Sequence, residues 1–226
     1  MEKSKVFLMA LILMLASLTA FAQTTAPAGE FYGGYQYMRL DTGAVQDAIN
    51  LAALEAGVPP FNFGRHQNLN GWSFGAQENL NSWFGGIIDV GGAYYTNKNI
   101  SVTSGNQTAK LRVRLHSYTF MAGPQFTIRR NSTFQPFARG LIGGGFVNSS
   151  ANILLNNVPL IAELKNDDAN FAFGGGAGTD MNFSPRLGMR VAVDYIRTQL
   201  FNDNQNNLRG TVSLVFRWGS TPARRR

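Results

Sequence analysis

Charged residues that alternate with small or polar residues are the clearest candidates for chemistry in this sequence. They occupy the non-apolar positions of segments that read as β-strands, and they are Asp89, Arg139, Asp180, Arg190, Asp194, Arg209 and Arg217. Their charges are nearly balanced and come from separate segments, so they can form ion pairs. A buried charge is tolerated when it is paired and costly when it is alone. We therefore predict that these seven residues form a charge network inside the protein.

Two smaller sets of residues could also act chemically. Lys110, Arg112 and Arg114 form a basic cluster that could neutralise lipid phosphates; alternatively, they are the solvated base of a loop. The two histidines, His66 and His116, could serve catalysis only with an orienting acid and a nucleophile in reach, and the sequence spacing supplies neither. Phosphate-loop and metal-spacing motifs are absent. We predict no catalytic residue, cofactor or metal site, and an enzyme is the less favoured alternative.

The sequence contains eight segments in which apolar side chains alternate with small or polar ones, and these segments would position the charged residues. For example, Phe120 and Phe126 alternate with Thr119 and Gln125. A period of two over about ten residues, repeated with turns between, is typical of transmembrane β-barrels. The sequence thus predicts an all-β fold, an eight-stranded antiparallel up-and-down transmembrane β-barrel. Its strands are expected at residues 30–40, 68–78, 83–95, 114–128, 134–147, 169–183, 186–198 and 208–218.

The expected connections fall into two classes. Those at 79–82, 129–133 and 184–185 are short, whereas those at 41–67, 96–113, 148–168 and 199–207 are long and polar. In membrane barrels the short turns face the periplasm and the long loops face outward. The first long loop has the signals of a short helix, with Asp41 or Thr42 as its cap and Gly57 at its end. Its apolar face would hold Val45, Ala48, Ile49 and Ala52, and it would form a lid, contact a partner or only pack on the rim.

The charged face of the strands is also crowded with glycine, and this decides which face looks inward. A soluble barrel with an apolar interior would show the same alternation. Glycine weakens a strand and brings no advantage on a water-facing surface. In an eight-stranded barrel, however, side chains fill the narrow interior, and small residues make room for arginines. We predict charges inside, aromatic residues toward lipid and no wide pore, with a narrow conduit for small or hydrophobic molecules as the alternative function.

The first residues have the pattern of a secretory signal peptide. Lys3 and Lys5 precede an apolar run from Val6 to Leu18, and Ala20, Phe21 and Ala22 form a small-x-small cleavage site. A retained membrane helix is the alternative, but the run is shorter than the ~20 residues that a span needs. We expect a signal peptide at 1–22, a barrel domain at 23–219 and a basic tail at 220–226. The chain has no cysteine and a net charge of +7. Because exported proteins rarely meet nucleic acid, we expect anionic lipid headgroups to be the counterpart of this charge.

Four stretches resemble the OmpA-type family of small outer-membrane β-barrel proteins. They are FMAGPQF at 120–126, QPFARGLIGGGF at 135–146, FGGGAG at 173–178 and VSLVFRW at 212–218. The resemblance covers essentially the whole mature length. It implies a location in the outer membrane of a Gram-negative-type cell. It also implies insertion by the outer-membrane assembly machinery, which recognises a last strand with alternating aromatic residues. Many members end at this aromatic residue, whereas here Gly219 to Arg226 follow Trp218. We expect a monomer with a non-enzymatic, structural or surface-interaction role.

Overall fold

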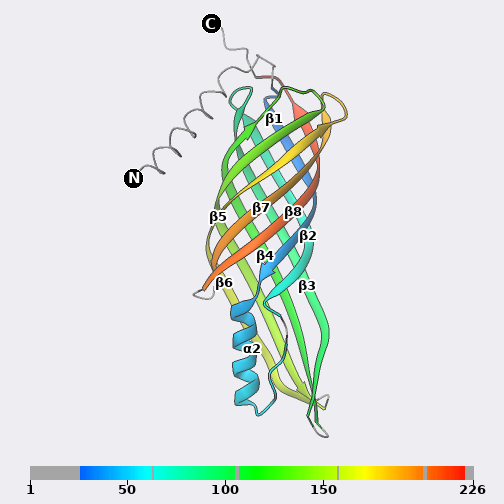
Figure 1. Cartoon of the computed structure of the whole chain (residues 1–226), viewed down its shortest axis with the longest axis vertical. Helices are drawn as coiled ribbons and strands as arrows, with labels where there is room; N and C mark the ends of the chain where they lie inside the picture. Colours follow the sequence, from blue (N-terminus) through cyan, green and yellow to red (C-terminus); the bar gives the residue numbers. More distant parts are fainter. Residues whose placement is uncertain (1–25, 63, 105–106, 157, 201–202, 222–226) are drawn as a thin grey trace, which may run out of the picture.

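The computed structural model describes residues 26–62, 64–104, 107–156, 158–200 and 203–221. The predicted signal peptide and residues 222–226 of the predicted tail lie outside these ranges. Within them, antiparallel strands neighbour one another in chain order, and β8 pairs with β1 to close a barrel (Figure 1). The predicted fold class is confirmed. Its elements are β1 (Gly29–Asp41), α2 (Gly43–Glu55), β2 (His66–Asn79), β3 (Phe84–Ser104), β4 (Gln107–Thr127), β5 (Phe134–Leu155), β6 (Val158–Asn182), β7 (Leu187–Leu200) and β8 (Asp203–Trp218).

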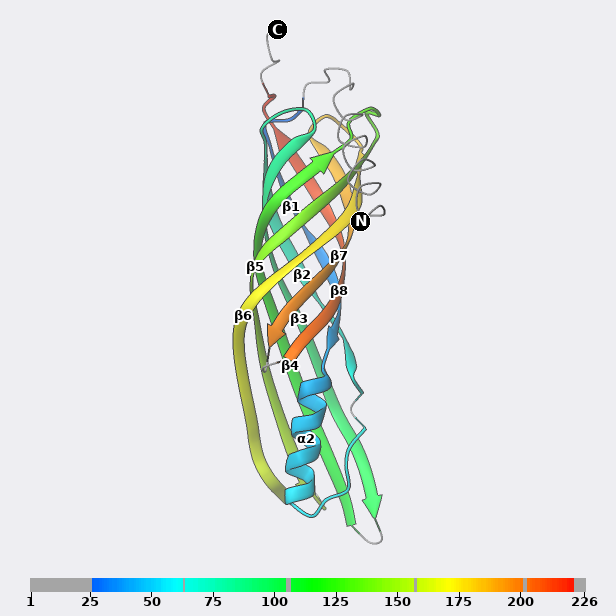
Figure 2. The same cartoon turned by 60° about the vertical axis from the view of Figure 1, so that its left-hand side comes forward.

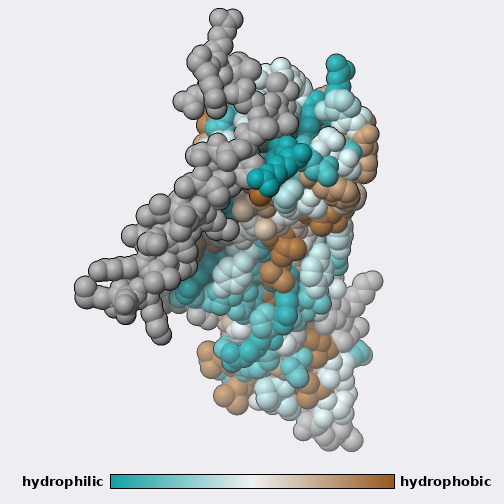
Figure 3. All heavy atoms as spheres, turned by 45° about the horizontal axis from the view of Figure 1, so that its top comes forward, coloured by the Kyte–Doolittle hydropathy of each residue, from teal (hydrophilic) through white to brown (hydrophobic). Residues whose placement is uncertain are grey.

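The barrel wall has an apolar outer face. Phe31, Phe120 and Leu214 expose more than half of their side-chain surface there, while the charged residues of the opposite face are buried. Phe31 stacks on Trp218 across the seam between β1 and β8, with ring centroids 4.5 Å apart. Hydrophobic side chains are visible along the wall in the space-filling view (Figure 3). An apolar outside and a charged inside are what the glycine-rich alternation predicts.

Three segments predicted as loops are largely strands instead. The shortest of them, 199–207, belongs to β7 and β8 apart from residues 201–202, which lie outside the described residues. Residues 96–113 form the hairpin of β3 and β4 apart from its tip, and residues 148–168 belong to β5 and β6 except around 156–157. These four strands have 21, 21, 22 and 25 residues, compared with 13 and 14 in β1 and β2. They therefore continue beyond the closed barrel. We call residues 95–104, 107–115, 147–155 and 158–168 the outer extension.

The alternation inverts where the outer extension begins, which explains the wrong prediction. On β4 the inward face changes from Ser117 and Thr119 to Leu111, Val113 and Leu115, all of which are buried. The outward face changes from aromatic residues to basic ones over the same positions. A polar outward face reads as a loop when only lipid-facing strands are expected. The strand period of two is nevertheless kept throughout.

The helix predicted in the first long connection is present as α2, and it covers the inner face of the outer extension (Figure 2). Ile49 and Ala53 are its buried residues, whereas Ala48 of the predicted face is exposed. The Asp41 carboxylate accepts a hydrogen bond from the Gly43 N–H at 3.1 Å. Thr42 occupies the cap position, but its hydroxyl donates to the Gly64 carbonyl instead.

Pro124 interrupts one ladder without shifting its register. The pairs between β4 and β5 resume from Gln125–Arg139 after Ala122–Ile142, while Pro124 stays opposite Gly86 on β3. A proline cannot donate to a ladder, so a local gap is the expected result. The ladder between β4 and β5 therefore has a gap at this proline and no bulge.

Candidate functional site

A central cluster of four charged residues crosses the barrel interior. Asp194 on β7 accepts two hydrogen bonds from Arg139 on β5, from Nε and Nη2, each at 2.7 Å. It also accepts one from Arg209 Nε on β8 at 2.9 Å. Arg209 Nη1 donates to Asp89 Oδ1 at 2.6 Å, so β3 is tied to β8 through the interior. Two arginines and two acids leave the central cluster neutral.

A second group, the turn-side cluster, lies at the barrel end that carries the short turns. It consists of Glu30, Arg129, Asp180, Arg190 and Arg217. Arg190 holds Asp180 with two hydrogen bonds, at 2.7 and 2.8 Å, and Glu30 with a third at 2.9 Å. Arg129 Nη2 donates to Glu30 at 3.2 Å. Three arginines against two acids give this cluster one surplus positive charge.

All seven residues of the predicted network are buried and belong to one of the two clusters. Strand register sets two of the pairs, because Asp194 lies opposite Arg209 and Asp180 lies opposite Arg190 on neighbouring strands. The interior glycines give them space. A Cβ atom on Gly176 would lie 2.1 Å from Asp194 Oδ1, which no packed structure allows.

Sequence reasoning missed two residues of the turn-side cluster and one tyrosine that binds the central cluster. Glu30 stands at the first position of the predicted strand 30–40, and Arg129 was assigned to a turn, so neither was included in the predicted inward face. Tyr32 donates its hydroxyl to Asp89 Oδ2 at 3.0 Å. The alternation of Phe31 with its neighbours was the signal that could have placed Glu30 and Tyr32 inside. Burial lowers the pKa of the Arg129 guanidinium, and nearby Glu30 opposes that shift.

Uncharged polar side chains such as Gln77 and Gln125, together with apolar ones, occupy further parts of the interior. Ile87, Met121, Leu141, Ala172 and Ile196 form one buried group within the barrel. A larger group joins α2 to the outer mouth and the outer extension. Its buried members are Met38, Leu40, Ile49, Ala53, Val58, Phe61, Leu69, Ala93, Ala109, Leu111, Val113, Leu115, Ala151 and Ile153. The helix therefore shares an apolar core with the strands at this mouth.

The predicted basic cluster lies on the outward face of the outer extension, beside a row of aromatic residues. Arg112 and Arg114 are exposed and Lys110 is half-buried. His116 comes next on the same face and packs edge-on against Tyr94, with ring centroids 5.4 Å apart. We call Lys110, Arg112, Arg114 and His116 the basic row. His66 begins β2 and is exposed opposite Asp41.

Two further features are absent from the described ranges: a helix that could span a membrane and a group of metal ligands. Neither α2 nor any other helix there has both the length and the apolarity to cross a membrane. The same ranges contain no group of three or more His, Asp and Glu side chains arranged to hold a metal ion.

Comparisons with known proteins give a family match and several similar solved structures. Residues 8–216 match the family described as "Outer membrane protein beta-barrel domain". Ail, the attachment invasion locus protein of Yersinia pestis, is 14% identical, with 84% of this chain and 100% of that chain covered and a TM-score of 0.52. Neisserial surface protein A is 9% identical, with 87% and 99% covered and a TM-score of 0.47. The outer membrane protease OmpT of Escherichia coli is 8% identical, with 87% and 99% covered and a TM-score of 0.45. No match was found among curated proteins.

Proposed function

The chain belongs to the family of outer-membrane β-barrel domains, and from this membership we propose that it is a closed, non-enzymatic barrel with a structural or surface-interaction role. The family places it in the outer membrane of a Gram-negative-type cell. Export through a cleaved signal peptide, insertion by the assembly machinery and a monomeric state are part of the proposal. Lipids of the outer membrane are its proposed partners.

The filled interior is the observation that carries this proposal. The central cluster and the turn-side cluster occupy the barrel with side chains that are 0–7% exposed. Arg139 and Asp194 meet in a bidentate pair, which combines charge attraction with fixed geometry. Eight strands leave an interior that side chains can fill, whereas open aqueous channels appear at about 16–18 strands. A permanent water-filled path is therefore not expected.

The surface-interaction role is supported by the shape of the outer extension. In the described residues, pairing of β3 with β2 reaches outward only to Tyr94, and pairing of β6 with β7 only to Ala172. The outer parts of β3 and β6 thus form the two edges of a four-stranded sheet. Sheet edges can accept a further strand from another chain. The basic row would meet lipid phosphates on the same structure.

Planar-bilayer recordings of the purified, refolded protein test the closed state. We expect no steady openings for the wild-type protein. The double variant Arg139→Gln with Asp194→Asn keeps the net charge but removes the bidentate pair, so we expect it to open transiently. Steady wild-type openings that change in the double variant would instead favour the narrow conduit. Lipid turnover that is lost in His116→Ala would favour an enzyme.

A further inference from the structure

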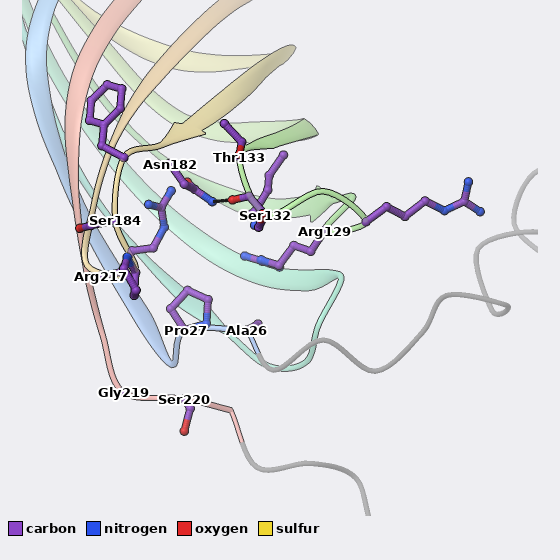
Figure 4. Close-up of a pocket in the computed structure, with 14 residues that line it drawn as sticks. Ala26, Pro27, Arg129, Ser132, Thr133, Asn182, Ser184, Arg217, Gly219 and Ser220 are labelled. Carbon is purple, nitrogen blue, oxygen red and sulfur yellow. Dashed lines mark hydrogen bonds between the residues drawn. The ribbon is translucent and has the colours of Figure 1, made fainter.

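The barrel end with the short turns contains a pocket with a volume of about 750 Å³ (Figure 4). This volume falls within the ~300–1,000 Å³ that small-molecule sites occupy. Its wall includes Arg129, Arg130 and Arg217, together with the hydroxyl and amide side chains of Ser132, Thr133 and Gln135. In Figure 4 the Arg129 and Arg217 side chains extend into this space from different strand ends. The pocket is thus lined by hydrogen-bond donors that suit an anion.

Arg217 is the residue that points to a ligand. It is only 4% exposed, yet none of its three guanidinium nitrogens makes a hydrogen bond. Its nearest acidic atoms are Asp180 Oδ2 at 3.3 Å and Glu30 Oε2 at 3.7 Å. Arg190 already engages both of these acids through shorter, aligned hydrogen bonds. A buried guanidinium that lacks hydrogen bonds is costly unless another acceptor reaches it.

The net positive charge of the turn-side cluster also indicates an anionic ligand. Arg190 and Arg129 balance Asp180 and Glu30, so the charge of Arg217 is the surplus one. The central cluster has no such surplus. An oxyanion in the pocket would neutralise this charge and could accept two parallel hydrogen bonds from the Arg217 guanidinium.

We propose that this pocket binds the oxyanion group of a small periplasmic molecule, a carboxylate or a phosphate, with Arg217 as its main contact. Arg129 and Arg130 contribute positive charge, and Ser132 and Thr133 contribute hydroxyl donors near the rim. The site lies at the opposite end of the barrel from the outer extension. Its occupancy is therefore independent of any surface-interaction role.

Isothermal titration of the refolded full chain in uncharged detergent tests the site, with inorganic phosphate and citrate as separate probes. We expect the wild-type protein to bind at least one probe, and the probe that binds identifies the type of oxyanion. Arg217→Gln should weaken binding at least about tenfold, because a charge-assisted hydrogen bond is lost. This variant should still fold, since the remaining cluster is neutral. Heat-dependent gel mobility checks the folding.

Arg186→Gln is the matched control, because Arg186 is an exposed arginine at the same end that does not line the pocket. It should bind as the wild type does. Arg130→Gln, in an exposed turn, is a second variant that should bind the probe several-fold more weakly than the wild type. If Arg217→Gln does not fold, the result for Arg130→Gln tests the proposal instead. The proposal is overturned if neither probe binds the wild-type protein, if folded Arg217→Gln or Arg130→Gln binds normally, or if Arg186→Gln weakens binding equally.

Discussion

Asp194 accepts hydrogen bonds from two arginines that reach it from β5 and β8. With a side chain of 0% exposure, it ties β5 to β7 and β8 through the interior. Asp47 on α2 offers a contrast, since its pair with Arg65 spans 3.9 Å between side chains that are 68% and 73% exposed. Exposed pairs contribute little to stability, whereas removing one partner of a buried pair leaves an uncompensated charge.

Asp194→Asn should therefore lower the free energy of unfolding by about 3–5 kcal/mol. The cause is that Arg139 and Arg209 would then share only Asp89. Urea unfolding of the protein in lipid vesicles measures the change. Asp47→Asn is the control and should cost no more than about 1 kcal/mol. Equal losses in the two variants would contradict the structural role of the central cluster.

At the scale of elements, the sequence predicts the strands well wherever one face meets lipid. The aromatic outward residues and the glycine-rich inward face placed the membrane part of each strand, and the signals around Asp41 and Gly57 placed α2. The outer extension was missed because its outer face meets water and its inner face meets a helix. On β4 the residues from Leu111 to Leu115 keep the period of two but exchange the polarity of its faces. The apolar face of this segment packs against α2, which favours a strand over a loop. The sequence of β4 alone does not show that contact.

Ile49→Ala tests whether α2 shares a core with the outer extension. Ile49 is 3% exposed, and truncating a buried isoleucine costs about 2–5 kcal/mol. Hydrogen exchange of the α2 amides should accelerate accordingly, while the heat-dependent gel mobility of the barrel stays unchanged. Leu51→Ala is the control on the same helix, because Leu51 is 60% exposed. A similar acceleration in both variants would mean that α2 is not packed as described.

Charge reversal in the basic row tests its contact with lipid phosphates. Each basic residue near an anionic surface contributes about 1 kcal/mol, so Arg112→Glu with Arg114→Glu should weaken lipopolysaccharide binding by at least about tenfold. Co-sedimentation with lipopolysaccharide-containing vesicles measures the loss. The double control Arg65→Glu with Arg186→Glu makes the same charge change away from the basic row. Unchanged binding in the Arg112 and Arg114 variant would show that the basic row is only a solvated face.

The whole molecule combines a lipid-facing barrel, a filled interior and a water-facing outer extension. On β4 the lipid-facing residues run from Tyr118 to Phe126, close to the ~9–11 residues that a tilted strand needs to cross a bilayer. His116 marks the change from aromatic to basic residues on that face. Tyr94 and Trp72 lie at the same level, joined by a hydrogen bond of 3.1 Å, as in the aromatic girdles of membrane barrels. The membrane surface should therefore cross β4 near His116.

Spin labels along the outward face of β4 test this arrangement most directly. The chain has no cysteine, so each introduced cysteine gives a single labelling site. In vesicles, we predict that labels at Arg112 and Arg114 collide mainly with a water-soluble nickel chelate. Labels at Phe120 and Ala122 should collide mainly with oxygen dissolved in lipid, with the change near His116. The same accessibility at all four positions, or a water-exposed label at Phe120, would contradict a barrel whose apolar face meets lipid.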